Sequence, residues 1–141
     1  MLGGARGQVD RLLGRRQRHV GAGRVDHGRF AVGRTPAFEI RALDYAARLG
    51  AKPSRITVRD TASRWGSCSS ARSLSFSWRL ILAPDFVLDY VVAHEVAHLR
   101  EMNHSPRFWA HVRSLVPDMD APQDWLKKNG RELQRYTADK A

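Results

Sequence analysis

The stretch "PDFVLDYVVAHEVAHLREM", residues 84–102, determines how the rest of the chain must pack. Pro84 and Asp85 are typical of the first turn of a helix. The apolar side chains that follow cover most of the circumference of that helix: Phe86, Val87, Leu88, Val91, Val92, Val96 and Leu99. A helix that is apolar almost all round is buried on all sides, so this segment is predicted to be the central element of the fold.

Three ionisable residues, His94, Glu95 and His98, lie inside this apolar helix. Buried ionisable groups are costly unless they are paired or bound to a metal. Side chains four residues apart project side by side, so both imidazoles can reach one metal ion. Glu95 lies beside the open coordination position, where it can take a proton from the metal-bound water as general base. The alternative is two histidines that are merely hydrogen-bonded within a core.

A third ligand is expected downstream, and His104 is the preferred candidate. A straight helix would carry His104 away from the metal, so the chain is predicted to turn at Met102 or Asn103. Asparagine tolerates the left-handed conformation that such a turn needs. The rival ligands are Glu101, His111 and Asp118, and His104 can instead cap the next helix.

Helices and short strands flank this segment. A helix is predicted from Thr35, a cap, to Gly50, a stop. Its expected apolar face consists of Phe38, Leu43, Ala46, Ala47 and Leu49. Residues 55–60 are predicted to form a strand, and residues 105–116 and 122–136 two helices, the second interrupted at Gly130.

Two further extended segments follow the first strand. In "SRWGSCSS", residues 63–70, Gly66 marks a bulge or a close backbone approach, and Trp65, Gly66 and Ser67 can pair with a substrate peptide. "SLSFSWRLIL", residues 73–82, alternates apolar and polar side chains, which predicts a half-buried strand antiparallel to its neighbour. The expected fold class is α+β, with a small, mostly antiparallel sheet packed on helices.

Four single residues allow two interpretations each, one functional and one structural. Arg64 or Arg79 can stabilise an oxyanion, although such arginines are more often exposed on the polar face of a strand. Cys68 is expected to be a small buried residue rather than a ligand, and Tyr90 to pack between helices rather than line the site.

The first 34 residues differ from the rest in composition. They hold eight of the 11 glycines and a charge of +6 out of the total of +10, with a single aromatic residue, Phe30. Such a segment buries too little apolar surface to order itself, so residues 1–34 are predicted to be a flexible basic arm and residues 35–141 one domain. The charge indicates either weak non-specific contact with nucleic acid or a compositional preference for arginine.

Cysteine content and hydropathy limit the location. Cys68 is the single cysteine of the 141 residues, so no internal disulfide can form, and a reducing cytoplasm is expected. No apolar run is long enough to cross a bilayer, and the basic N-terminus lacks the apolar segment of a signal peptide.

Four segments, "RWGSCSS", "LSFSWRLILAP", "LDYVVAHEVAHL" and "NHSPRFW", together resemble the YgjP-like metallopeptidase family over about residues 52–136. That family is close to the minigluzincins and more distantly related to SprT-like and WLM-type proteases. The resemblance implies a zincin-like α+β fold, Zn²⁺ bound by His94 and His98 with His104, and Glu95 as general base. Members of that family have a longer leading region with strands, so the resemblance implies nothing about residues 1–34.

The expected function is a zinc-dependent hydrolase, a metallopeptidase that cleaves amide bonds in peptides or unfolded proteins. Two alternatives stay open. One is a basic nucleic-acid-associated protein in which a closed, four-ligand zinc site is structural; the other is a zinc hydrolase of a non-peptide substrate.

Overall fold

A mixed three-stranded sheet forms one layer of the molecule. The computed structural model describes residues 35–61 and 64–136, so the arm predicted at residues 1–34 lies outside the described residues. Strands β1 (Arg55–Arg59), β2 (Gly66–Cys68) and β3 (Ser73–Ser77) lie in the order β1-β3-β2. The β2–β3 pair is antiparallel, as predicted, but β1 pairs with β3 in parallel, so the sheet is not mostly antiparallel. The chain reverses direction twice between β1 and β3, which restores the original direction.

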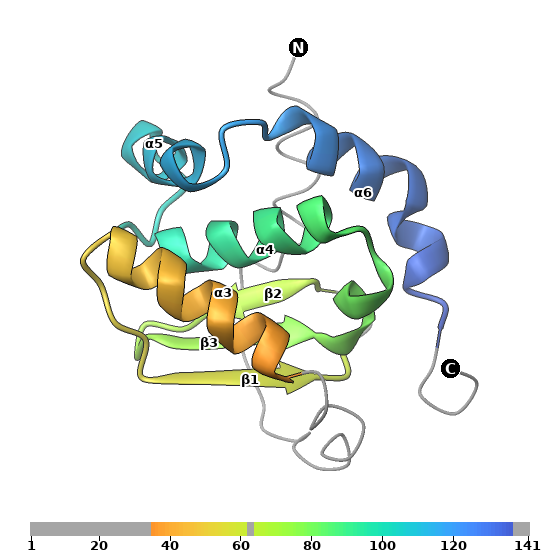
Figure 1. Cartoon of the computed structure of the whole chain (residues 1–141), viewed down its shortest axis with the longest axis horizontal. Helices are drawn as coiled ribbons and strands as arrows, with labels where there is room; N and C mark the ends of the chain where they lie inside the picture. The colour runs from red at the N-terminus through yellow and green to blue at the C-terminus, as the bar shows by residue number, and fades with distance from the viewer. Residues whose placement is uncertain (1–34, 62–63, 137–141) are drawn as a thin grey trace.

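Helix α4 (Asp85–Ala97) is the centre of the fold, as its apolar circumference predicts. It contacts α3 (Thr35–Arg48), α5 (Pro106–Leu115), α6 (Asp120–Leu133) and the strands β2 and β3. Figure 1 shows α3 and α4 side by side against the sheet, with α5 and α6 on the opposite side of α4. Phe86 is an exception to the predicted burial: it lies in the first turn of α4 and is 43% exposed.

The apolar face of α3 differs from the predicted one. Phe38, Ala42 and Ala46, spaced four residues apart, are buried, and the ring of Phe38 stacks on Phe76 of β3 at 5.2 Å. Leu43 is 52% exposed, and Ala47 is exposed as well. Both follow a buried residue directly, and one residue turns the helix by roughly 100°, which carries their side chains off the packed stripe.

The strand predicted over residues 73–82 ends at Ser77, where a 3-10 helix, η2 (Trp78–Leu82), begins. The Ser77 hydroxyl accepts a hydrogen bond from the Arg79 backbone N–H at 3.2 Å. This local cap competes with further strand pairing. Trp78 and Leu80 are still buried, but they lie in a helical turn rather than in a strand.

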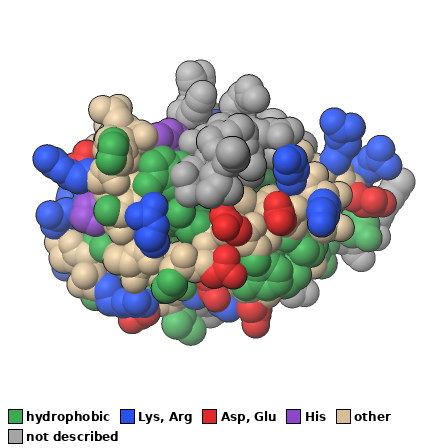
Figure 2. Space-filling view, turned by 90° about the horizontal axis from the view of Figure 1, so that it is seen from above, with side chains coloured by type: hydrophobic (Ala, Val, Ile, Leu, Met, Phe, Trp, Pro, Cys, Tyr) green, Lys and Arg blue, Asp and Glu red, His purple; other side chains and the backbone are tan. Residues whose placement is uncertain are grey.

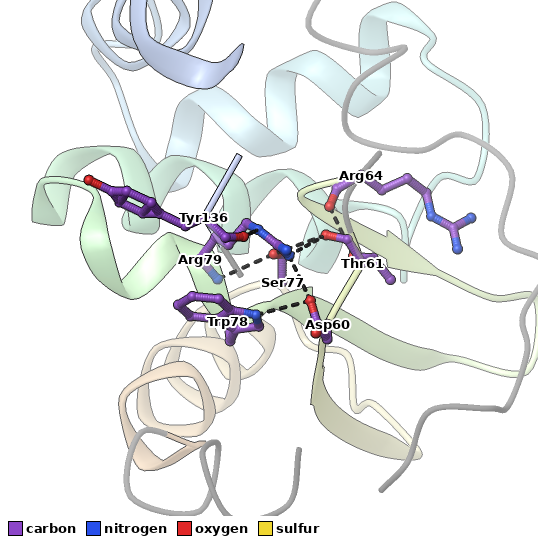
Figure 3. Close-up of polar contacts among 7 residues, drawn as sticks. All are labelled: Asp60, Thr61, Arg64, Ser77, Trp78, Arg79 and Tyr136. Carbon is purple, nitrogen blue, oxygen red and sulfur yellow. Dashed lines mark hydrogen bonds and ion pairs between the residues drawn. The ribbon is translucent and has the colours of Figure 1, made fainter. Parts of the chain in front are cut away.

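The 3-10 turn rotates Arg79 into the interior, where the side chain is 4% exposed. Its Nη1 donates to Asp60 Oδ1 and to the Thr61 carbonyl, each at 2.9 Å, and its Nε donates to the Tyr136 carbonyl at 2.9 Å (Figure 3). Arg79 therefore ties the end of β1 to the chain after α6. It is not the exposed strand residue that the alternation predicted, and these bonds favour a structural role over oxyanion stabilisation.

Helix α6 is continuous through Gly130, where an interruption was predicted. A Cβ at Gly130 would lie 3.3 Å from Cζ2 of Trp65, a residue that is fully buried. The glycine thus makes room for the indole. Within residues 35–61 and 64–136, no helix combines the length and apolarity that crossing a membrane requires.

Candidate metal centre

The last turns of α4 hold three buried polar side chains in the core of the molecule. His94 and Glu95 are each 1% exposed and His98 is 7% exposed. The two histidines are four residues apart, so their rings lie on one side of the helix, with centroids 5.2 Å apart. The sequence spacing therefore acts as expected, because the backbone keeps helical dihedral angles up to His98, the C-cap of α4.

His104 reaches the same place from the loop between α4 and α5. Its ring centroid lies 5.3 Å from that of His94 and 4.8 Å from that of His98. The helix ends at Ala97, several residues before the predicted turn, so the loop needs no left-handed asparagine. Gly50 and Arg72 are the described residues with positive φ, and Asn103 is not among them. Ser105 then starts α5, its hydroxyl accepting from the Phe108 N–H at 3.2 Å.

The three histidines form the one group of metal-ligating side chains found in residues 35–61 and 64–136. Their candidate ligand nitrogens all lie within 4.8 Å of one another. A backbone carbonyl can only accept, so His98 Nδ1 carries the proton and donates to the Glu101 carbonyl at 3.0 Å. His94 Nδ1 lies 3.0 Å from Glu95 Oε2, and a donating Nδ1–H suits this carboxylate. Both contacts leave Nε2 as the atom with a lone pair for a metal.

Burial also keeps His98 neutral. Desolvation lowers the pKa of its imidazole from 6.5 to about 4, outweighing the opposing effect of the Glu95 carboxylate. A metal ligand must be deprotonated, so at neutral pH His98 needs to lose no proton before it binds an ion.

Two aromatic residues of α5 pack on the cluster. Phe108 stacks on His98 with ring centroids 4.4 Å apart, and Trp109 stacks on His104 at 6.0 Å. Phe108 is buried, whereas Trp109 is half-buried. Their contact with the histidines was not predicted, although His104 and Phe108 are four residues apart.

Strand β2 lies directly against Glu95. A Cβ at Gly66 would be 2.9 Å from Glu95 Cγ, closer than real Cβ atoms approach, and 3.3 Å from Glu95 Oε2, which is a tight contact. Gly66 therefore marks the close approach that the sequence suggested, here between a strand backbone and the helix. Cys68 on the same strand is buried, and burial, followed by the charge of Glu95, raises the pKa of its thiol to about 12. It is the small buried residue that was expected.

The rival ligands all lie outside the histidine cluster. The Glu101 carboxylate pairs with Arg107 at 3.3 Å, and the Asp118 carboxylate accepts from the Asp120 N–H at the start of α6. His111 lies on α5 and is not part of the group.

Tyr90, one turn before His94, is fully buried and joins α4 to α6. Its hydroxyl accepts a hydrogen bond from Gln123 Nε2 at 2.9 Å, and its ring lies 6.2 Å from the His94 ring. The packing role predicted for Tyr90 therefore fits its position.

The donor set fits a divalent metal. Three imidazoles, two with the Nδ1 side engaged, form an all-nitrogen site of the kind that suits zinc and other first-row metals. Among the described residues no fourth ligand joins them, and Glu95 adjoins the cluster.

Comparison with known proteins identifies the family of the chain. The model of the YgjP-like metallopeptidase domain matches residues 34–129, more than half of the chain. One similar solved structure is the crystal structure of the metallopeptidase zymogen of Pyrococcus abyssi abylysin. It is 19% identical to the chain with a TM-score of 0.58, over 72% of this chain and 99% of that one.

No curated protein sequence matches the chain. The structural likeness, at its low identity, concerns the fold, and it agrees with the predicted α+β architecture of a metallopeptidase. The family match confirms the resemblance seen in the sequence, and with it the prediction of a metal-dependent peptidase. The chain belongs to the YgjP-like metallopeptidase family.

Proposed function

We propose that this metallopeptidase is a zinc enzyme that hydrolyses amide bonds in peptides or unfolded proteins. His94, His98 and His104 would hold the ion, and Glu95 would be the general base. The observation that carries the proposal is the cluster of three imidazoles, two of them buried, with a buried carboxylate beside it.

Zinc suits this set of donors best. Three histidines with one open position are a frequent ligand set of catalytic zinc, whereas magnesium and calcium prefer oxygen ligands. When bound, the ion supplies Lewis acidity, which makes a water molecule more acidic and polarises the scissile carbonyl.

Glu95 would move the proton. Its carboxylate accepts the proton of the attacking water and delivers it to the leaving amine. Two contacts limit where the carboxylate can go: the His94 ring at 3.0 Å and the Gly66 backbone of β2. This confinement leaves the carboxylate less conformational freedom to lose before it transfers a proton, which would lower the entropic part of the barrier.

The alternative of a structural zinc in a nucleic-acid-binding protein is less well supported. Structural zinc has four protein ligands, and the group in the described residues has three. Figure 2 shows Asp and Glu side chains in a band between Lys and Arg side chains on the face seen from above. The basic residues described on this face therefore form no continuous positive surface of the kind that nucleic acid requires.

Replacing Glu95 tests the catalytic proposal. Glu95→Gln keeps the size of the side chain but cannot accept a proton, so zinc content and fold should persist while hydrolysis falls about 10²–10⁴-fold. Zinc is measured by mass spectrometry of the purified protein, and cleavage by mass spectrometry of products from an unfolded protein. Equal turnover by wild type and Glu95→Gln would refute the role of Glu95.

Replacing the histidines tests the metal site. His94→Ala with His98→Ala should remove the zinc and lower stability, because metal affinity is partly folding free energy. His104→Ala should weaken zinc binding, whereas the matched control His111→Ala, on α5, should not. If His111→Ala were the more damaging of the two, the third ligand would lie on α5.

A further inference from the structure

A cavity of about 350 Å³ lies between α3, α4 and the loop that joins α5 to α6. Most of the residues that line it are apolar: Phe86, Leu115, Val116, Pro117, Ala121 and Pro122. Its volume is within the range typical of ligand sites. The cavity is separate from the metal centre, because Asp89, which lines it, lies about 13 Å before His98 along the axis of α4.

The cavity is open to solvent on the side of the α5–α6 loop. Phe86 is 43% exposed, and Pro117, Asp118 and Ala121 are exposed as well. A small molecule is usually enclosed by its site, whereas an open apolar groove between helices suits a peptide segment. Apolar surface of this kind with polar groups at its rim is typical of sites that bind another protein.

Carboxylates outnumber cations around the cavity. Asp89 and Asp118 line it, and its described lining contains neither Lys nor Arg. Asp89 pairs with Arg41, which also lies 3.6 Å from Asp85, so one guanidinium serves two carboxylates. Asp118 accepts hydrogen bonds from two backbone N–H groups at the start of α6, at 3.1 and 3.2 Å. It has no ion pair within residues 35–61 and 64–136, so its charge is not neutralised by a cation.

Tyr45 adds a hydrogen-bonding group to the wall of the cavity. Burial, followed by the charge of Asp89, raises the pKa of its phenol, so the hydroxyl stays protonated at neutral pH and can donate. Among the residues that the structure describes, this hydroxyl has no hydrogen-bond partner. Arg48 lies over the Tyr45 ring at 5.4 Å, but it pairs with Asp44 at 3.7 Å. Around the cavity, four carboxylates are therefore balanced by only two arginines.

This acidic environment contrasts with the chain as a whole, which carries a net charge of +10. At physiological ionic strength charges are screened beyond about 8 Å, so the nearby carboxylates determine which ligands bind here. Figure 2 looks down on the side of the molecule that carries α5 and α6, where Asp and Glu side chains adjoin hydrophobic ones. An apolar groove beside unneutralised carboxylates is complementary to a segment that is both apolar and basic.

We propose that this cavity is a docking site for a basic segment of a partner protein. One bulky apolar side chain of the segment would pack on Phe86, a neighbouring Lys or Arg would pair with Asp118, and a backbone carbonyl would accept from the Tyr45 hydroxyl. Docking here needs no metal, so the proposal does not depend on the peptidase function, and its failure would leave that function untouched.

Three fluorescein-labelled peptides test the chemistry of the partner. The first has a phenylalanine between two arginines, the second has serine in place of the phenylalanine, and the third has glutamates in place of the arginines. They are titrated with the full, zinc-loaded chain carrying Glu95→Gln, so that no peptide is cleaved, and binding is followed by anisotropy. The first peptide should bind about tenfold more tightly than either of the others. Equal affinities, or no binding at all, would overturn the proposal.

Two substitutions locate the binding in the cavity. Ala121→Leu fills the cavity from an exposed position without a change of charge and should abolish the preference for the phenylalanine peptide. Its matched control is Ala47→Leu, at an exposed position of α3 outside the lining. Asp118→Asn keeps the oxygen that accepts from the start of α6 but removes the charge, so it should weaken binding by about threefold. Glu132→Gln, which removes an exposed charge elsewhere on α6, should not. Unchanged binding by Ala121→Leu would overturn the proposal.

Photo-cross-linking separates a partner from the other possible occupants. A photoreactive amino acid at position 120, an exposed position beside the cavity, is activated in the full chain with the phenylalanine peptide present, and the products are identified by mass spectrometry. Cross-links to the peptide that disappear in Ala121→Leu would support the proposal. Cross-links to residues 1–34 of the same chain, or to a second copy of the chain, in place of the peptide would overturn it.

Discussion

Replacing Gly66 by alanine would force β2 and Glu95 into the same space. The new Cβ would lie 2.9 Å from Glu95 Cγ, 3.3 Å from Glu95 Oε2 and 3.2 Å from the Ser75 carbonyl oxygen. Overpacking of this kind costs about 1–3 kcal/mol. The loss of chain entropy in the unfolded state offsets about 0.4–1 kcal/mol, so the net destabilisation should be about 1–2 kcal/mol.

The contact with Glu95 can be isolated with a double-mutant cycle. Glu95→Ala removes Cγ and the carboxylate, and with them two of the three close contacts. In that background Gly66→Ala should cost about 0.5 kcal/mol or less, so the coupling between the two positions should be about 1 kcal/mol. Stability is measured by urea unfolding at saturating zinc, followed by tryptophan fluorescence, with midpoints compared at a constant m value.

Gly130→Ala is the matched control, because its nearest neighbour is Trp65 at 3.3 Å and not Glu95. The gain in helix propensity, about 1 kcal/mol, should roughly balance the tight contact. The effect should be the same with and without Glu95. If Gly66→Ala were equally destabilising in both backgrounds, the Ser75 carbonyl would be the limiting contact, and the argument that β2 confines Glu95 would be wrong.

Three further predictions concern single side chains. As the pH falls from 6.5 to 4, the unfolded chain binds a proton at His98 while the folded chain does not, so the metal-free protein should lose about 3 kcal/mol of stability. Urea midpoints across this pH range should show the loss, and His98→Gln should make it smaller. The thiol of Cys68, with its pKa raised to about 12, should react slowly with a disulfide reagent at pH 8 and rapidly once urea unfolds the chain; fast reaction in the native protein would contradict its burial. Arg79→Met should destabilise by about 3 kcal/mol because three hydrogen bonds of a buried guanidinium are lost, whereas the exposed Arg131→Ala should change stability by less than about 0.5 kcal/mol. Similar thermal melts of the two variants would refute the role of Arg79.

The parts of the fold that were predicted correctly depend on signals within one helix. Helix α4 is central because apolar residues surround it, and His94 and His98 meet because helical spacing brings them together. Ser105 starts α5 with a side-chain cap that the sequence shows directly. Each of these depends on residues a few positions apart, where local geometry decides the outcome.

The parts that were missed depend on tertiary contacts or on competition between local structures. The alternation after Ser77 suits a strand, but the Ser77 hydroxyl caps a 3-10 turn and rotates Arg79 inward. The alternation of apolar and polar residues likewise does not show whether β1 and β3 pair in parallel or antiparallel. The contacts of Phe108 and Trp109 with the histidines follow from how α5 crosses α4, which residue spacing within α5 does not determine.

The bond between Arg79 and residue 136 bears on how the chain can vary. The acceptor is a main-chain carbonyl, whereas the Tyr136 side chain is itself largely exposed. Any amino acid offers the same carbonyl, so most substitutions at position 136 should keep this bond. Deletion of the residue would remove it. A reporter or affinity tag fused after residue 141 should leave this bond intact, whereas a stop codon at position 136 would leave the guanidinium of Arg79 one acceptor short inside the protein.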